Sequence, residues 1–103
     1  MPYTSGFAPN KLNGHFLLHG WEFGATSASN YQALADTFLG TPMNADTIEC
    51  IRARENDKIR YNPVTNEFGV LRDSNIIRTY FKPTPVWHGL PTNLDYFLQE
   101  CAK

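Results

Sequence analysis

The sequence predicts an α+β fold in which N-terminal helices pack on a four-stranded antiparallel β-meander that is followed by a short C-terminal helix. Two observations carry this prediction. Apolar residues change near residue 45 from a helical to a strand period, and every connector between the expected strands is too short for a crossover. A length of 103 residues with 42% hydrophobic content fits one packed domain. We expect a linker or lead-in over 1–12, which has no period, and a single domain over 13–103.

Two helices are expected before residue 45. Residues 14–22 predict a short first helix that ends near Gly20. Ser27 or Ser29 can cap the second helix, and Gly40 begins the stop signal that Pro42 completes. Between these signals the residues at helical spacing are apolar: Tyr31, Leu34, Ala35, Phe38 and Leu39.

Strand periodicity begins at Thr47 and continues through four apolar segments separated by polar turns. The segments are TIECIRAR (47–54), IRYNP (59–63), EFGVLR (67–72) and IIRTYFKP (76–83). A proline-rich loop follows, and Thr92 can then cap a last helix. One stripe of that helix is apolar, formed by Leu94, Phe97, Leu98 and Cys101.

The two cysteines, Cys50 and Cys101, exclude a disulfide-rich scaffold and a zinc site of four thiolates. The favoured interpretation is two buried thiols. The alternative is a disulfide, which would close a long loop and stabilise the fold by about 4 kcal/mol. The apolar runs fall far short of the roughly 20 residues that span a bilayer, and the N-terminus lacks a signal-peptide pattern, so we expect neither a membrane span nor a cleavable signal.

The net charge of −1 argues against a polybasic nucleic-acid arm or a membrane-surface domain. The charge is unevenly placed, however, because seven of the nine Lys and Arg residues lie between 52 and 82, which gives +3 there and −4 elsewhere. A period of two puts Arg78, Tyr80 and Lys82 on one strand face, and Lys58 and Arg60 likewise share a face. Such a face suits a phosphate backbone and a stacked base, or it is the solvated side of a half-buried sheet.

His15 and His19 are four residues apart and therefore share one face of the first helix. Three interpretations stay open. They could form half of a metal site, although no HExxH motif and no further ligand cluster accompany them, and we therefore expect no metal. They could serve as general acid and base in metal-free phosphodiester cleavage, or form a capping or half-buried pair without chemistry. His88 lies in a loop among prolines, where a structural role is expected.

Five segments together resemble a known group of proteins: HFLLHGWEFG, TSASNYQALADTFLG, IRYNPVTNEFGV, IIRTYFKP and HGLPTNLDYF. They are similar to the C-terminal toxin domains of polymorphic and contact-dependent inhibition (CdiA-type) toxins, within the barnase, EndoU, colicin E5/D and RelE-like nuclease group. The resemblance runs from about residue 13 to 97. It implies a cofactor-free, metal-independent endoribonuclease, often tRNA-directed, that a larger secreted toxin delivers to the target-cell cytoplasm and a cognate immunity protein neutralises.

The resemblance also implies site residues. Those assigned to catalysis are His15, His19, Tyr61 and Thr79, and those assigned to substrate binding are Arg60, Arg78 and Lys82. In the implied reaction, one histidine takes the proton of a ribose 2′-OH, which attacks phosphorus and leaves a 2′,3′-cyclic phosphate. The sequence departs from the family pattern where Leu18 and Trp21 stand in place of frequent lysines.

Strand geometry adds one condition. Neighbouring residues of a regular strand point to opposite faces, so Arg78 and Thr79 can converge only through a bulge or at a strand end. The alternative function is a non-catalytic module that binds RNA or an acidic protein with the same basic sheet. A small structural accessory protein is a third possibility.

Overall fold

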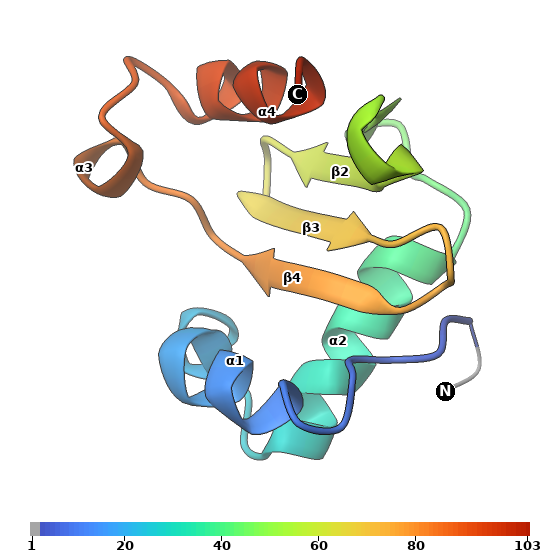
Figure 1. The fold of residues 1–103 in the computed structure, drawn as a ribbon. Helices are drawn as coiled ribbons and strands as arrows, with labels where there is room; N and C mark the ends of the chain where they lie inside the picture. Colours follow the sequence, from blue (N-terminus) through green and yellow to red (C-terminus); the bar gives the residue numbers. More distant parts are fainter. Residues whose placement is uncertain (1–2) are drawn as a thin grey trace.

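The computed structural model describes residues 3–103 and confirms the α+β architecture. Two helices precede the sheet, α1 (Leu12–His19) and α2 (Ala28–Gly40), and a 3₁₀ turn, η1 (Gly20–Phe23), follows α1. The strands are β1 (Ile48–Ile51), β2 (Lys58–Asn62), β3 (Glu67–Leu71) and β4 (Ile77–Phe81), with a 3₁₀ turn, η2 (Arg54–Asn56), before β2. The helices α3 (Pro85–His88) and α4 (Asn93–Cys101) complete the chain. Figure 1 shows α4 on one side of the sheet and α1 with α2 on the other.

The helix boundaries follow the capping residues. Ser27 accepts a hydrogen bond from the Asn30 amide at 3.0 Å, and Thr92 accepts one from the Asp95 amide at 3.1 Å, as expected for helix N-caps. The expected first helix is divided into two elements, because α1 ends at His19 and the 3₁₀ turn η1 follows directly. Gly24 then ends η1 with a φ of 64°, a conformation that favours glycine.

The sheet is an antiparallel meander in the order β1-β2-β3-β4. Its register is regular except between β3 and β4, where Val70 pairs with Thr79 but Leu71 pairs with Ile77. Arg78 is therefore an extra residue in β4, and such a bulge re-aims the side chains around it. The expectation that Arg78 and Tyr80 share a face is wrong, because Tyr80 is buried against α2 while Arg78 reaches Asp57 on the other side.

The sheet separates two apolar clusters. The cluster on the α2 side is made by α2, the N-terminal segment, β3 and β4, with Phe7, Tyr31, Ala35, Leu39, Leu71, Ile77 and Tyr80. The cluster on the α4 side is made by α4 and the opposite face of the strands, with Ile59, Tyr61, Phe68, Val70, Phe81, Tyr96 and Phe97. Both faces of the sheet are covered, so β2 and β3 are buried along most of their length, and β2 is buried even though its polar residues alternate with apolar ones.

The described part of the expected lead-in packs into the domain. Phe7 is buried and forms a bridge with Ile77, and Thr4 donates through its amide and hydroxyl to the buried carboxylate of Asp36 at 2.8 and 2.6 Å. The segment differs from a linker because its buried side chains complete the α2-side cluster. Residues 1 and 2 of the predicted lead-in lie outside the described residues.

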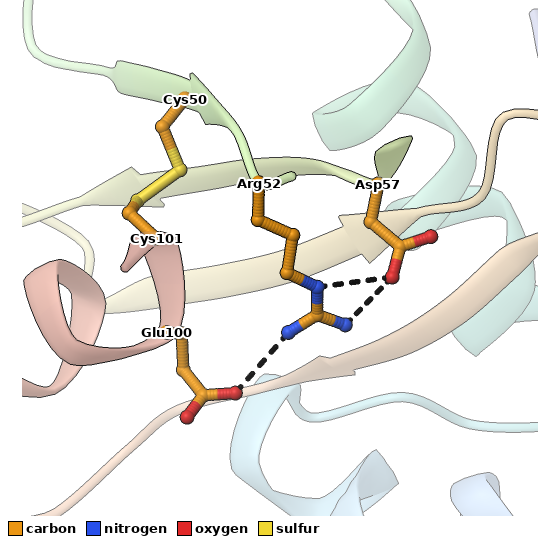
Figure 2. The surroundings of a disulfide bond; sticks show 5 residues. All are labelled: Cys50, Arg52, Asp57, Glu100 and Cys101. Atoms are coloured by element: carbon orange, nitrogen blue, oxygen red, sulfur yellow. Dashed lines mark hydrogen bonds and ion pairs between the residues drawn. A yellow bond between two sulfur atoms is a disulfide. The ribbon is translucent and has the colours of Figure 1, made fainter. Parts of the chain in front are cut away.

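The favoured interpretation of two free thiols is wrong, because Cys50 of β1 and Cys101 of α4 form a disulfide with their Cα atoms 6.1 Å apart. Figure 2 shows this bond beside an ionic cluster in which Arg52 bridges Asp57 and Glu100. Both features attach α4 to the sheet. Within residues 3–103, no helix has the length and apolar character to cross a membrane.

Candidate active site

A cleft of about 490 Å³ lies between α1, the end of β4 and α3. Figure 1 shows α1 and α3 on opposite sides of the C-terminal end of β4. The residues that line the cleft are Leu18, His19, Glu22, Thr79, Phe81, Lys82, Thr84 and Trp87. Among the seven residues predicted for the site, His19, Thr79 and Lys82 meet here.

His19 is the imidazole of the cleft, and Glu22 holds it. The Nδ1 atom of His19 lies 2.8 Å from Oε2 of Glu22, one turn further along the chain. The other carboxylate oxygen, Oε1, accepts a hydrogen bond from the Lys82 amide at 2.6 Å. Glu22 is thereby fixed from both sides, and it connects η1 to the end of β4. A proton on Nδ1 satisfies the bond to Glu22 and leaves the Nε2 lone pair free to accept a proton.

Thr79 and Lys82 approach His19 from the strand side. Thr79 pairs with Val70 and lies in the row of β4 that faces α4, together with Phe81. The Phe81 ring lies 5.2 Å from the His19 ring, centroid to centroid. The Lys82 ammonium lies 5.4 Å from the Phe23 ring centroid, a cation–π contact that positions positive charge beside the cleft.

His15 shares a helix face with His19, as expected, but does not line the cleft. Its ring packs on Phe7 with centroids 4.9 Å apart and lies 6.5 Å from the His19 ring. Its buried Nδ1 atom has no hydrogen-bond partner among the described residues. Burial lowers the pKa of His15 from its ordinary value, and the nearby charges of His19 and Lys11 lower it further. This environment favours the neutral ring.

Arg60 and Tyr61 lie outside the cleft. Arg60 is only 7% exposed, and its guanidinium donates to the carbonyl oxygens of Phe38 and Thr41 at the end of α2 and to Glu49. Tyr61 is buried beneath α4, where its hydroxyl donates to Oδ1 of Asn66 at 3.0 Å. Burial raises the pKa of Tyr61. The contacts of both residues are those of side chains that hold α2 and the β2–β3 turn in place.

Arg78 is directed toward the far end of β4. Its Nη2 atom bonds Glu55, and its Nε atom lies 3.2 Å from the buried carboxylate of Asp57. Asp57 also accepts two bonds from Arg52, at 2.7 and 3.0 Å. Three of the seven cations between residues 52 and 82 are therefore ion-paired, namely Arg52, Arg60 and Arg78. The sheet presents less free positive charge than the sequence indicates.

Five residues that line the cleft are not among the predicted site residues, and Glu22 and Trp87 are the two of these that matter most for its chemistry. Glu22 follows His19 at the i, i+3 spacing of helical neighbours, a signal that the sequence does carry. Trp87 lies on α3, a single turn in the proline-rich loop, where apolar periodicity gives no signal. Within residues 3–103, no group of three or more His, Cys, Asp or Glu side chains is arranged to hold a metal ion.

No protein-family model matches this sequence, and no curated protein sequence matches it either. A solved structure does match the fold: a ribonuclease from Escherichia coli in complex with its inhibitor protein. The TM-score is 0.59 with 18% sequence identity, and the match covers 82% of this chain and 95% of the ribonuclease chain. The chain thus has a ribonuclease-like fold. Its cleft contains the His19 imidazole, which is bonded to the Glu22 carboxylate, and also the hydroxyl of Thr79 and the ammonium group of Lys82.

Proposed function

We propose that this chain is an endoribonuclease domain that cleaves RNA through attack of a ribose 2′-OH on the adjacent phosphorus. The observation that carries the proposal is the His19–Glu22 pair, which lies in a cleft of a ribonuclease-like fold. Imidazole is the side chain whose unperturbed pKa allows proton transfer near neutral pH. A carboxylate bonded to its Nδ1 atom orients the ring and stabilises the imidazolium that forms.

In the proposed reaction the Nε2 atom of His19 takes the proton of the 2′-OH. The 2′-oxygen then bonds to phosphorus, and the bond from phosphorus to the 5′-oxygen breaks, which leaves a 2′,3′-cyclic phosphate on one fragment. The Lys82 ammonium gives the leaving 5′-oxygen its proton. Glu22 keeps its negative charge throughout and acts as a positioning residue for His19.

The phosphorane formed on the way carries extra negative charge on its nonbridging oxygens. The Thr79 hydroxyl lines the cleft and can donate a hydrogen bond to one of them, and Lys82 adds its positive charge to the lining of the same cleft. Preorganised donors of this kind contribute roughly 3 kcal/mol each in enzymes. His19, Thr79 and Lys82 thus have catalytic roles in this proposal, whereas His15, which packs on Phe7 outside the cleft, has none.

The resemblance to CdiA-type toxin domains supports a finer proposal. We infer that the substrate is tRNA, that the domain is delivered as part of a larger toxin to the cytoplasm of a competing bacterium, and that an immunity protein neutralises it. The E. coli ribonuclease of similar fold was solved with an inhibitor protein, which supports an inhibitor as partner. The alternative, a non-catalytic module that binds RNA with a basic sheet, is less favoured because the sheet arginines are paired with carboxylates.

The proposal is tested by the chemistry of the RNA ends. Purified protein is incubated with total tRNA in the presence of EDTA, and the fragments are analysed for 5′-hydroxyl and 2′,3′-cyclic phosphate ends. Discrete fragments with these ends are expected, and none with the His19→Ala variant. Intact tRNA after incubation with folded protein would refute the proposed function, and fragments with 5′-phosphate ends would refute the mechanism.

A further inference from the structure

We propose that the cleft beside His19 holds one unpaired nucleotide, with its base stacked on the exposed indole of Trp87. The inference rests on the proposed ribonuclease function and deepens it, since it names single-stranded RNA as the substrate at the point of cleavage. It makes Trp87 a substrate-binding residue.

Trp87 is exposed, yet its neighbours fix its position. Its side chain is 63% exposed, while its ring makes edge contacts with Phe81 and Tyr96, each at a centroid distance of 5.4 Å. The short helix that carries it is closed at both ends, by the Thr84 cap and by Gly89 with a φ of 76°. An aromatic side chain that is already ordered loses little conformational entropy on binding, and its apolar face gains when a flat partner covers it.

The rest of the cleft matches the two halves of a nucleotide. Leu18, which is 68% exposed on α1, and Phe81 of β4 line the cleft with apolar surface, as Trp87 does. The cleft also contains His19, which can transfer a proton, and Lys82, which carries positive charge. A flat apolar base and an attached phosphate present this combination of surfaces. A base inside a duplex has both faces covered by its neighbours, whereas an unpaired base can stack on an aromatic side chain.

The second tryptophan provides a matched control. Trp21 is 77% exposed on η1, and its Nε1 atom donates to the Leu18 carbonyl oxygen at 2.9 Å. It lines a neighbouring hollow with Glu22 and Lys82, but not the cleft that holds His19 and Trp87. Loss of its indole therefore removes a similar exposed apolar surface without removing the proposed stacking face.

The experiment measures binding of a short single-stranded RNA by fluorescence anisotropy, in a His19→Ala background that keeps the RNA uncut. The same RNA annealed to its complement serves as the duplex probe, at one fixed salt concentration because phosphate contacts make affinity salt-dependent. We expect Trp87→Ala to weaken single-strand binding roughly tenfold or more, within the range of base–aromatic stacking. Trp87→Phe should keep most of the affinity, Trp21→Ala should equal the parent, and the duplex should bind more weakly than the single strand.

The outcomes separate this inference from the proposed function. If Trp87→Ala binds single-stranded RNA within twofold of the parent, or the duplex binds as tightly as the single strand, the stacking site is wrong even where the parent chain cuts RNA. If binding depends on Trp87 but the chain with His19 intact does not cut, the stacking site stands and the ribonuclease proposal fails. Binding to neither RNA overturns the stacking site, and the tRNA cleavage assay then decides the ribonuclease proposal separately. Should Trp87→Ala fail to fold, Trp87→Leu, which keeps an apolar side chain but loses the ring, decides the question.

Discussion

Removal of the Cys50–Cys101 disulfide should lower the free energy of unfolding by an amount that follows from the length of the loop that the bond closes. The bond joins residues separated by 51 positions in the chain. A cross-link over a loop of that length restricts the unfolded chain by about 14 cal/mol/K, or about 4 kcal/mol at room temperature. Small domains are stable by roughly 5–15 kcal/mol in total. The loss is therefore a large fraction of the stability of this chain.

The change is the double variant Cys50→Ser, Cys101→Ser, compared with the parent in oxidised and reduced form. Urea unfolding is followed by circular dichroism, and the transition midpoint of the variant is expected to fall by roughly 2–3 M. The reduced parent is a control that carries no substitution and should show a similar fall. Equal midpoints for all three samples, or two titratable thiols in the oxidised native protein, would refute the reasoning.

Three further predictions concern single side chains. Arg60→Met should lower the unfolding free energy by about 2–3 kcal/mol, since the carbonyl oxygens of Phe38 and Thr41 lose their donor; a change below about 0.5 kcal/mol in urea unfolding contradicts this. The pKa of His15 is lowered in the fold. When the pH falls below the ordinary histidine pKa of about 6.5, this side chain therefore binds more protons in the unfolded chain than in the folded one, and the free energy of unfolding should decrease as the pH drops from 7 to 5. Replacement by His15→Gln should flatten that dependence, and an unchanged slope counts against it. Glu22→Gln should slow RNA cleavage at least about tenfold, because an amide cannot stabilise the imidazolium of His19; an unchanged rate constant would exclude Glu22 as its positioning residue.

The sequence predicts the elements of this fold well where the signal is local. The caps at Ser27 and Thr92 and the short polar turns define the helices and the meander because each depends on residues a few positions apart. The burial of Phe7 and the disulfide depend on segments far apart in the chain. Local periodicity carries no information about such contacts.

The candidate site depends on both kinds of signal. His19, Thr79 and Lys82 belong to segments whose placement follows from the order of the elements, and they meet in one cleft. The role of Arg60 depends on the end of α2, and that of Arg78 on a bulge and a buried aspartate. Charge patterning along a strand gives the position of a cation but does not show which carboxylate will neutralise it.

The proposed mechanism depends most directly on the imidazole of His19. The measurement is the single-turnover rate constant of RNA cleavage in EDTA for the parent, for His19→Ala and for His88→Gln. His88 serves as the control because its ring bonds Asn93 outside the cleft. General acid–base catalysis contributes roughly 10²–10⁴-fold in enzymes. Cleavage by the parent and by His88→Gln, with a loss of at least about a hundredfold in folded His19→Ala, is the predicted result. A folded His19→Ala protein that cuts within threefold of the parent would contradict it.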